Sequence, residues 1–250
     1  MQVSKYSASG NDFVIFHSLI KKDRSLLAKR LCDRHEGVGA DGLIVIVPHE
    51  TADFEWQFYN SDGSNAAMCG NGTRACAHYA YRNGLAPKVM QFMTEAGIIV
   101  STVDGNVVES QMTDPVMKSE PFEAYGHHWY FYDTGVPHLV SYVDDLRVFD
   151  IELARKMRYE YNANVNFAKV GSSLHVRTYE RGVEDETLAC GTGMVACFYA
   201  AFQEGKVSSS MRVFPASGEE LSVRFHDNKL YFKGEVRSVF DAVAQGINDL

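Results

Sequence analysis

The sequence lacks long apolar runs and basic clusters. Apolar runs such as Leu43 to Val47 are far shorter than the roughly 20 residues that a membrane-spanning helix needs. Acidic residues outnumber basic ones by 32 to 24, and no basic run is longer than the pair Lys21-Lys22. We therefore expect no membrane partner and no nucleic-acid partner, because nucleic-acid binding usually requires a basic face.

The sequence also lacks the cysteine pattern of an exported or zinc-binding protein. Its five cysteines are an odd number, no Cys-x-x-Cys pair occurs, and the first ten residues show no signal pattern. The cysteines are Cys32, Cys69, Cys76, Cys190 and Cys197. We expect a cytoplasmic protein with reduced thiols and no metal site.

An internal repeat lies at an offset of 121 residues. Cys69 to Cys76 reads CGNGTRAC, and Cys190 to Cys197 reads CGTGMVAC. The alignment runs without a gap to Gly97 and Gly218 and holds nine identities in 29 positions. Ordinary composition predicts roughly two identities over that length. The chain therefore contains a duplication.

Both copies predict the same order of elements: a strand, the Cys-Gly-x-Gly turn, an apolar helix and another strand. The expected elements are strands 54–58, 89–93, 174–178 and 211–214, and helices over 75–80 and 196–201 that end at Gly84 and Gly205. Further strands are expected at 13–16, 43–47, 98–103, 128–132, 221–225 and 229–232, with a surface helix at 151–160. Helices with so little charge are expected to be buried within their own sheets.

These elements predict an α+β fold with two pseudo-symmetric lobes, each a mixed, mainly antiparallel sheet wrapped round a central apolar helix. The expected lobes are residues 1–115 and 116–238, joined near 114–120, where Pro115 and the following Pro121 indicate irregular chain. Residues 239–250 are expected to pack back on the N-terminal lobe. An active site is expected in the cleft between the lobes.

The duplicated turn predicts a specific chemistry. A cysteine at a helix start faces unpaired N–H groups and the positive end of the helix dipole, which favour the thiolate. The same N–H groups form a site for a carboxylate. Inverting a carbon beside a carboxylate requires a base on one face and an acid on the other, and two equivalent thiols meet that requirement. Cys69 and Cys190 are therefore the candidate acid/base pair.

Alternative interpretations of the cysteines remain. Cys32, Cys76 and Cys197 are expected to be inert packing residues, as buried cysteines usually are. The scaffold could bind an amino acid without catalysis, or exchange disulfides, although a Cys-x-x-Cys pair is typical of the latter. We expect instead that oxidation joins Cys69 to Cys190 and abolishes activity.

The ordered motifs resemble the diaminopimelate epimerase family over nearly the whole chain. The matching segments are residues 9–13, 33–35, 37–42, 59–64, 69–74, 137–138, 164–167, 179–182, 186–187 and 189–193. The resemblance implies interconversion of LL- and meso-diaminopimelate without a cofactor, by a homodimer. A related two-cysteine enzyme of the proline racemase type is the alternative. Asn60, Asn164 and the pair Glu180-Arg181 argue against it, because proline has no distal charged groups for them to bind.

The resemblance also implies roles for individual residues. It implies catalytic roles for Cys69, Cys190, His138 and Glu180. It implies substrate binding by Asn11, Asn60, Gly70, Asn71, Asn164, Glu180, Arg181, Gly191 and Thr192. Arg181 is suited to bind the distal carboxylate of a diamino diacid, and Glu180 to accept from its ammonium group. Val136 and Gly42 depart from the family pattern, which has Asn and Gln there.

Overall fold

The computed structural model describes residues 1–147 and 149–246 and divides the chain into two compact units. The first contains Met1–Ser110 and the chain from Gly234 onward, and the second is Gln111–Lys233. The division falls inside strands β7 (Val107–Gln111) and β16 (Lys229–Glu235). The sequence placed the boundaries at 115 and 238. No helix in the described part of the chain is long and apolar enough to cross a membrane.

The first unit holds eight strands and two helices among the described residues. These are β1 (Gln2–Ala8), β2 (Asn11–His17), α1 (Ser25–Cys32), β3 (Gly42–Val47), β4 (Phe54–Asn60), α2 (Gly70–Arg82), β5 (Val89–Thr94), β6 (Gly97–Asp104), β7 and β17 (Arg237–Val243). Hydrogen bonds join them in the order β17-β1-β2-β3-β4-β5-β6-β7. Only the pairs β2–β3 and β4–β5 are parallel in this series.

The second unit repeats this arrangement. Its elements are β8 (Val116–Ala124), β9 (His127–Asp133), β10 (Pro137–Tyr142), α3 (Ile151–Tyr161), β11 (Asn164–Val170), β12 (Leu174–Glu180), β13 (Asp185–Thr187), α4 (Gly191–Gln203), β14 (Ser210–Phe214), β15 (Leu221–His226) and β16. The order is β8-β9-β10-β11-β12-β14-β15-β16, with parallel pairs β10–β11 and β12–β14. The mixed, mainly antiparallel sheet of each unit follows the sequence prediction.

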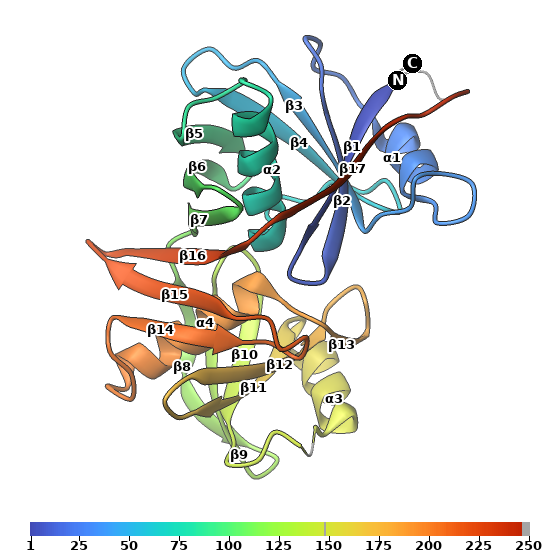
Figure 1. Cartoon of the computed structure of the whole chain (residues 1–250). Helices are drawn as coiled ribbons and strands as arrows, with labels where there is room; N and C mark the ends of the chain where they lie inside the picture. Colours follow the sequence, from blue (N-terminus) through green and yellow to red (C-terminus); the bar gives the residue numbers. More distant parts are fainter. Residues whose placement is uncertain (148, 247–250) are drawn as a thin grey trace. The chain divides into compact units, whose positions relative to one another are not determined.

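The strands β17 and β8 occupy equivalent places at the edges of the two units' sheets. β17 pairs with β1, with Lys5 opposite Phe240, as β8 pairs with β9. Figure 1 shows β17, near the end of the chain, running beside β1 at its start. Of the segment 239–250, residues 247–250 lie outside the described residues. The prediction of irregular chain over 114–120 holds for residues 114 and 115, which lie outside any strand, but not from Val116, where β8 begins. This edge strand tolerates Pro121 through its irregular register with β9.

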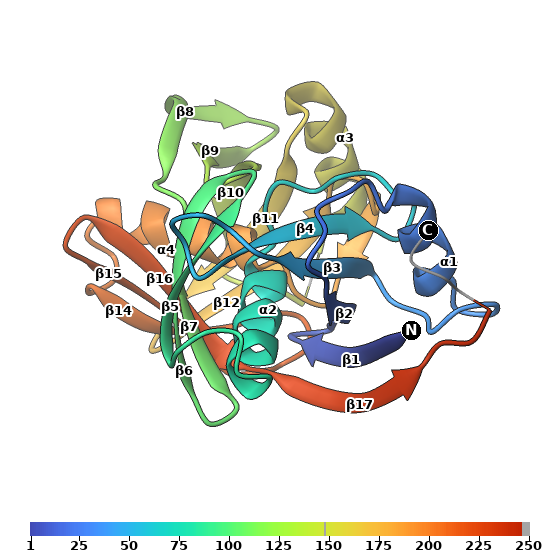
Figure 2. The same cartoon turned by 90° about the horizontal axis from the view of Figure 1, so that it is seen from above.

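The central helices are buried along almost their whole length. In α2 every residue from Gly70 to Ala80 is buried, and α4 is buried from Gly191 to Phe198. Figures 1 and 2 show α2 between β5–β7 on one side and β1, β2 and β17 on the other. Gly84 and Gly205 end the helices with φ of 68° and 66°, a conformation that glycine adopts without steric cost.

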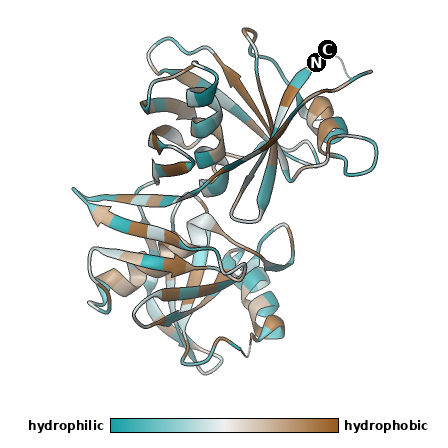
Figure 3. Cartoon of the chain, viewed as in Figure 1, coloured by the Kyte–Doolittle hydropathy of each residue, from teal (hydrophilic) through white to brown (hydrophobic). Residues whose placement is uncertain are grey.

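A second apolar layer lies on the outer face of each sheet. In the first unit α1 packs Leu27, Leu31 and Cys32 against a cluster that includes Val14 and Val45. Figure 3 colours α1 with both hydrophobic and hydrophilic residues, as expected for a helix with one buried side. In the second unit α3 occupies the matching place in the chain, between β10 and β11. The sequence predicted α3 but missed α1, which has only eight residues.

Candidate active site

The first Cys-Gly-x-Gly turn places a thiol at the start of α2. Cys69 is the N-cap, with extended backbone at φ −150° and ψ 114°, and α2 begins at Gly70. Its Sγ accepts a hydrogen bond from the Gly72 backbone N–H at 3.3 Å. The half-buried thiol therefore stands where the first N–H groups of a helix point away from the helix. The same N–H groups are the donors that a carboxylate would need.

A line of polar side chains fixes the side chain of Asn71 beside this turn. Asn71 donates to Oδ1 of Asn11 at 2.7 Å, and Asn11 donates to Oδ2 of Asp41 at 3.1 Å. Arg74 donates to Oδ1 of Asn71 at 2.8 Å and to Ser9 Oγ at 2.6 Å. The carboxylate of Asp41, at one end of this line, can only accept hydrogen bonds, and the guanidinium of Arg74, at the other end, can only donate them. The amides of Asn11 and Asn71 between them therefore each have one orientation.

The Asp41 end of this line is held by further charges. Arg34 donates to Asp41 at 2.8 Å and to both carboxylate oxygens of Asp12 at 2.9 and 3.0 Å. Lys5 forms an ion pair with Asp12 at 2.7 Å. Burial tends to raise the pKa of Asp12, but the bonds from Arg34 and Lys5 prevail and lower it to about 2. The Asp12 carboxylate is therefore charged at neutral pH.

Asn60 and Gly42 lie opposite one another at the ends of β4 and β3. Asn60 is exposed and donates to Ser64 Oγ at 3.0 Å, so it lies outside the line that joins Asn11 and Asn71. A Cβ on Gly42 would lie 2.6 Å from the ring of Phe58 and 2.9 Å from the carbonyl oxygen of Tyr59. The packing around β3 therefore leaves no room for a longer side chain at this position.

The second turn places a more deeply buried thiol at the start of α4. Cys190 is the N-cap, is 7% exposed, and lies 3.6 Å through Sγ from the hydroxyl of Thr192. Thr134 donates to the carbonyl oxygen of Thr192 at 2.9 Å. Both N-cap cysteines have extended backbone, with φ −119° and ψ 107° at Cys190. Their sulfur contacts differ, because Cys69 Sγ accepts from a backbone N–H whereas Cys190 Sγ lies beside a side-chain hydroxyl.

His138 lies on β10 behind the second turn and is fully buried. Its Nε2 lies 2.8 Å from Thr192 Oγ1, and its Nδ1 lies 3.2 Å from Nδ2 of Asn166. Burial, with a contribution from the positive charge of Arg181, lowers the pKa of His138 to about 3. The imidazole is therefore neutral at physiological pH, and it reaches Cys190 through Thr192.

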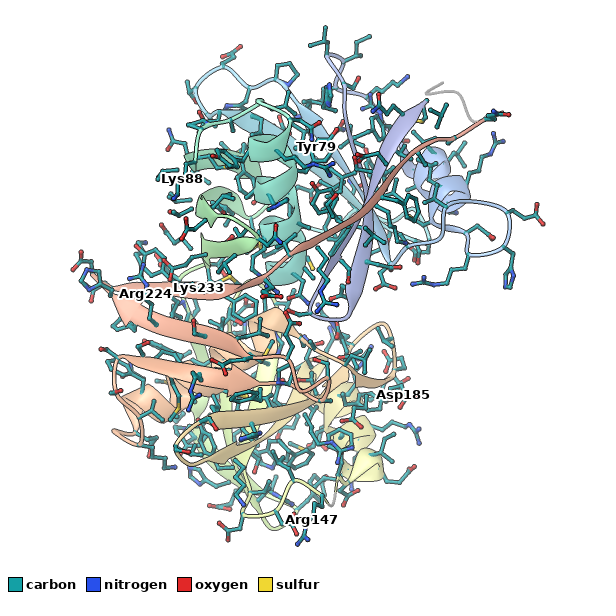
Figure 4. All side chains as sticks on the ribbon, in the orientation of Figure 1. Tyr79, Lys88, Arg147, Asp185, Arg224 and Lys233 are labelled. Carbon is teal, nitrogen blue, oxygen red and sulfur yellow. The ribbon has the colours of Figure 1, made fainter. Side chains whose placement is uncertain are left out.

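Asn164, Glu180 and Arg181 gather where β11 and β12 meet. Asn164 donates to the Pro137 carbonyl at 3.1 Å and accepts from the Arg181 backbone N–H at 2.9 Å. Thr187 donates to Glu180 at 2.8 Å from the short hairpin that carries Asp185, labelled in Figure 4. The fold thus brings together an amide, a carboxylate and a guanidinium-bearing residue, the groups that a zwitterionic ligand requires.

The other three cysteines are packing residues, as the sequence indicated. Cys32 is 2% exposed, and Cys76 and Cys197 are fully buried in the central helices. Burial raises the pKa of the Cys32 thiol to about 12 and places the pKa values of Cys76 and Cys197 well above their ordinary value. None of these thiols is poised to form a thiolate.

Sequence reasoning missed the residues that orient the others. Arg74 is fully buried in a helix of mostly small and apolar residues, which was a visible signal of a structural cation. Asp41 and Asn166 lie inside the family-like segments 37–42 and 164–167. Only the fold reveals that they form hydrogen bonds with Asn11 and His138, respectively. Val136 lies half-buried in the turn before β10, where its carbonyl accepts from the Thr134 backbone N–H at 3.1 Å.

Comparison with known proteins identifies the family of this chain. The family model for diaminopimelate epimerase matches residues 3–118 and 130–239. The chain belongs to the diaminopimelate epimerase family. It is 59% identical over 249 residues to the diaminopimelate epimerase of a Nitratiruptor species, covering 99% of this chain and 100% of that protein. Identity to the diaminopimelate epimerase of Campylobacter lari is 54%, over 97% of this chain and 98% of that protein.

Solved structures extend the likeness of the diaminopimelate epimerase fold to more distant proteins. A probable proline racemase from Agrobacterium radiobacter K84 matches with a TM-score of 0.79 at 13% identity, covering 99% of this chain and 94% of that one. A PhzF-family phenazine biosynthesis protein from Enterococcus faecalis gives 0.74 at 13% identity, over 97% and 98%. At such low identity the likeness concerns the fold alone.

Proposed function

We propose that this chain interconverts LL- and meso-diaminopimelate by moving the α-proton between Cys69 and Cys190, without pyridoxal phosphate or a metal. One observation carries the proposal: in both copies of the fold a cysteine is the N-cap of a buried helix that begins with Gly-x-Gly. Membership of the diaminopimelate epimerase family supplies the substrate.

The proposed reaction uses one thiolate and one thiol, each on its own face of the α-carbon. The thiolate removes the α-proton, the thiol delivers a proton to the opposite face, and the roles reverse in the other direction. Helix N–H groups at Gly70-Asn71 and Gly191-Thr192 would bind the carboxylate and stabilise the negative charge that spreads onto it as the proton leaves. His138 assists Cys190 through Thr192.

The distal half of the substrate is assigned to the remaining polar residues. Arg181 is suited to a two-pronged bond with the distal carboxylate, and Glu180 to the distal ammonium group. The amides of Asn11, Asn60 and Asn164 would complete the binding of polar groups. A proline-type substrate has no distal charges and would leave Glu180 and Arg181 without ligands, which disfavours that alternative.

The test is proton NMR of the reduced protein with LL-diaminopimelate in D₂O, without added cofactor. The proposal predicts loss of the α-proton signal and formation of the meso isomer. Cys76→Ala, which removes a fully buried thiol from the same helix as Cys69, is the matched control and keeps the activity. If the wild-type protein leaves diaminopimelate unexchanged but exchanges proline, the proline-type alternative replaces this proposal.

We also propose a homodimer in the cytoplasm. The cytoplasm supports the reaction because thiols that transfer protons must remain reduced. Val239, Phe240 and Val243 on β17 are 54%, 45% and 70% exposed, and this apolar surface supports contact with a second copy. Sedimentation equilibrium gives the mass directly, and a monomer at micromolar concentration would contradict the dimer.

A further inference from the structure

A line of five side chains leads from the sheet of the second unit to the thiol of Cys190. In order they are Thr178, Asn166, His138, Thr192 and Cys190. None is more than 7% exposed, and His138 and Asn166 are fully buried. Because these side chains are shielded from water, the hydrogen bonds among them determine which atom carries each proton.

The amide of Asn166 has one allowed orientation. Its Nδ2 lies 2.8 Å from the carbonyl oxygen of Leu139, and its Oδ1 lies 2.8 Å from the hydroxyl of Thr178. A carbonyl oxygen can only accept, so turning the amide over would bring two oxygen atoms together. The sheet thus directs the second N–H of Asn166 at His138.

This orientation decides the tautomer of His138. Because Nδ1 faces an amide N–H at 3.2 Å, it must accept, and the single proton of the neutral ring then resides on Nε2. Nε2 donates to Thr192 Oγ1 at 2.8 Å. The Thr192 hydroxyl accepts that bond, and its own proton is left to point toward Cys190 Sγ at 3.6 Å.

We propose that Asn166 and Thr178 are positioning residues that hold His138 as the neutral Nε2–H tautomer and so turn the hydroxyl of Thr192 into a donor to Cys190. The inference rests on the proposed function for its role in catalysis. A donor on the sulfur stabilises the thiolate of Cys190 relative to its thiol. His138 then acts by orientation and takes up no proton itself.

The first unit has no such line at the matching positions, where its side chains are apolar. Tyr59 and Tyr179 stand at equivalent register positions, opposite Leu43 on β3 and Val165 on β11. Counting from this pair, the counterparts of His138, Asn166 and Thr178 are Phe13, Ile44 and Phe58. The rings of Phe13 and Phe58 contact each other, with centroids 6.0 Å apart. We call the line from Thr178 to Cys190 the relay. It therefore acts on the sulfur of Cys190 and has no counterpart at these positions behind Cys69.

The tautomer can be measured directly in the reduced, full-length protein labelled with ¹⁵N-histidine. The expected spectrum has Nδ1 of His138 unprotonated and Nε2 protonated, with no titration between about pH 5 and 8. The signals are assigned by their loss in His138→Gln, or by Overhauser contacts to the Thr192 methyl group if that variant is unstable. A proton on Nδ1, or titration of His138 near the ordinary histidine value, would overturn the proposal.

The effect on the sulfur is measured by alkylation with iodoacetamide, since the thiolate is the reacting form. Thr192→Val keeps the shape of the side chain and removes the donor, and should slow initial alkylation of Cys190 at neutral pH by roughly tenfold. Thr192→Ser restores the hydroxyl and should restore the rate. Cys69 in the same molecule, quantified by peptide mass spectrometry, is the internal control and should be unchanged.

Equal rates for Cys190 in wild type and Thr192→Val would overturn the inference, as would equal slowing at Cys69. Thr178→Val removes the hydroxyl that donates to Oδ1 of Asn166, so the amide is less firmly oriented. The alkylation rate of Cys190 should therefore fall toward the rate in Thr192→Val. Neither measurement uses diaminopimelate. A protein that fails to epimerise it contradicts the proposed function, whereas a wrong tautomer contradicts only the relay.

Discussion

A Cβ built on Gly193 would lie 2.4 Å from the amide oxygen of Asn166 and 3.3 Å from the imidazole of His138. The second glycine of this turn therefore makes room for the buried polar line behind Cys190. Its counterpart in the first copy, Gly72, has its nearest such contact at 3.3 Å, with the Cβ of its own N-cap Cys69. One repeated motif thus meets two different steric requirements.

Gly193→Ala is expected to destabilise the protein by about 2 kcal/mol, because the added methyl group must displace Asn166 from its hydrogen bonds. Helix propensity alone would favour alanine by about 1 kcal/mol. Urea unfolding measures the change, and Gly72→Ala is the matched control with a smaller cost. Equal stability of the two variants would contradict the role assigned to Gly193.

His138 is expected to make the protein less stable as the pH falls below about 6.5. In the unfolded chain a histidine has a pKa near 6.5, whereas burial lowers the pKa of His138 to about 3. Between these values the unfolded state binds a proton that the folded state does not. The free energy of unfolding therefore falls with decreasing pH, with a limiting slope of ~1.4 kcal/mol per pH unit.

The pH effect is measured by urea unfolding of wild type and His138→Gln at about pH 7 and about pH 5. The free energy of unfolding of the variant should depend less steeply on pH, by an amount that approaches the slope for one bound proton. Asp12, with its pKa lowered to about 2, loses its stabilising charge only below the usual aspartate range, so it does not interfere in this window. Parallel slopes for the two proteins would show that His138 is protonated in the folded state.

Arg74 is expected to be a large contributor to the stability of the first unit. It is fully buried and donates to Ser9, Asn71 and the Glu235 carbonyl. Arg74→Met removes these bonds and should cost about 3 kcal/mol by urea unfolding. Arg82→Met, in the same helix but exposed, should cost less than about 1 kcal/mol. Similar losses in both would contradict this account.

Arg181 is expected to determine recognition of the distal carboxylate. Arg181→Met should lower kcat/KM for diaminopimelate by roughly 100-fold, because a charge-assisted bond is lost and Glu180 remains. Steady-state assays in both directions measure the loss. Arg155→Met, which alters an exposed arginine paired with Glu152 on α3, is the control. An unchanged kcat/KM in Arg181→Met would remove this residue from the site.

Much of the fold was predictable from local pattern, because the repeat, the apolar helices and their glycine stops are encoded within short segments. The helices α2 and α4 each begin directly after the motif cysteine, as the sequence indicated. By contrast, β17 takes the place in the first unit that β8 takes in the second, and it joins the end of the chain to its start, for example Ser238 to Tyr6. The sequence led us to expect residues 239–250 on the N-terminal lobe, but no local pattern identifies β1 as the partner strand.

The candidate site was predictable to a similar extent. The cysteines are marked by their duplication, and the polar motifs by resemblance. Asn166 and Thr178 could not be assigned, because Asn166 reaches His138, and Thr178 reaches Asn166, only once β10, β11 and β12 pair. Arg74 and Asp41 also gain meaning only from the side chains that the fold brings to them.

The most direct test of the central claim is deuterium exchange into LL-diaminopimelate with Cys69→Ser and Cys190→Ser beside the wild type. Formation of the meso isomer should fall at least about 1,000-fold in each variant, because inversion requires both an acid and a base. Cys197→Ala, a buried thiol in α4, should retain activity. Inversion within about tenfold of the wild-type rate in either serine variant would contradict the two-thiol mechanism.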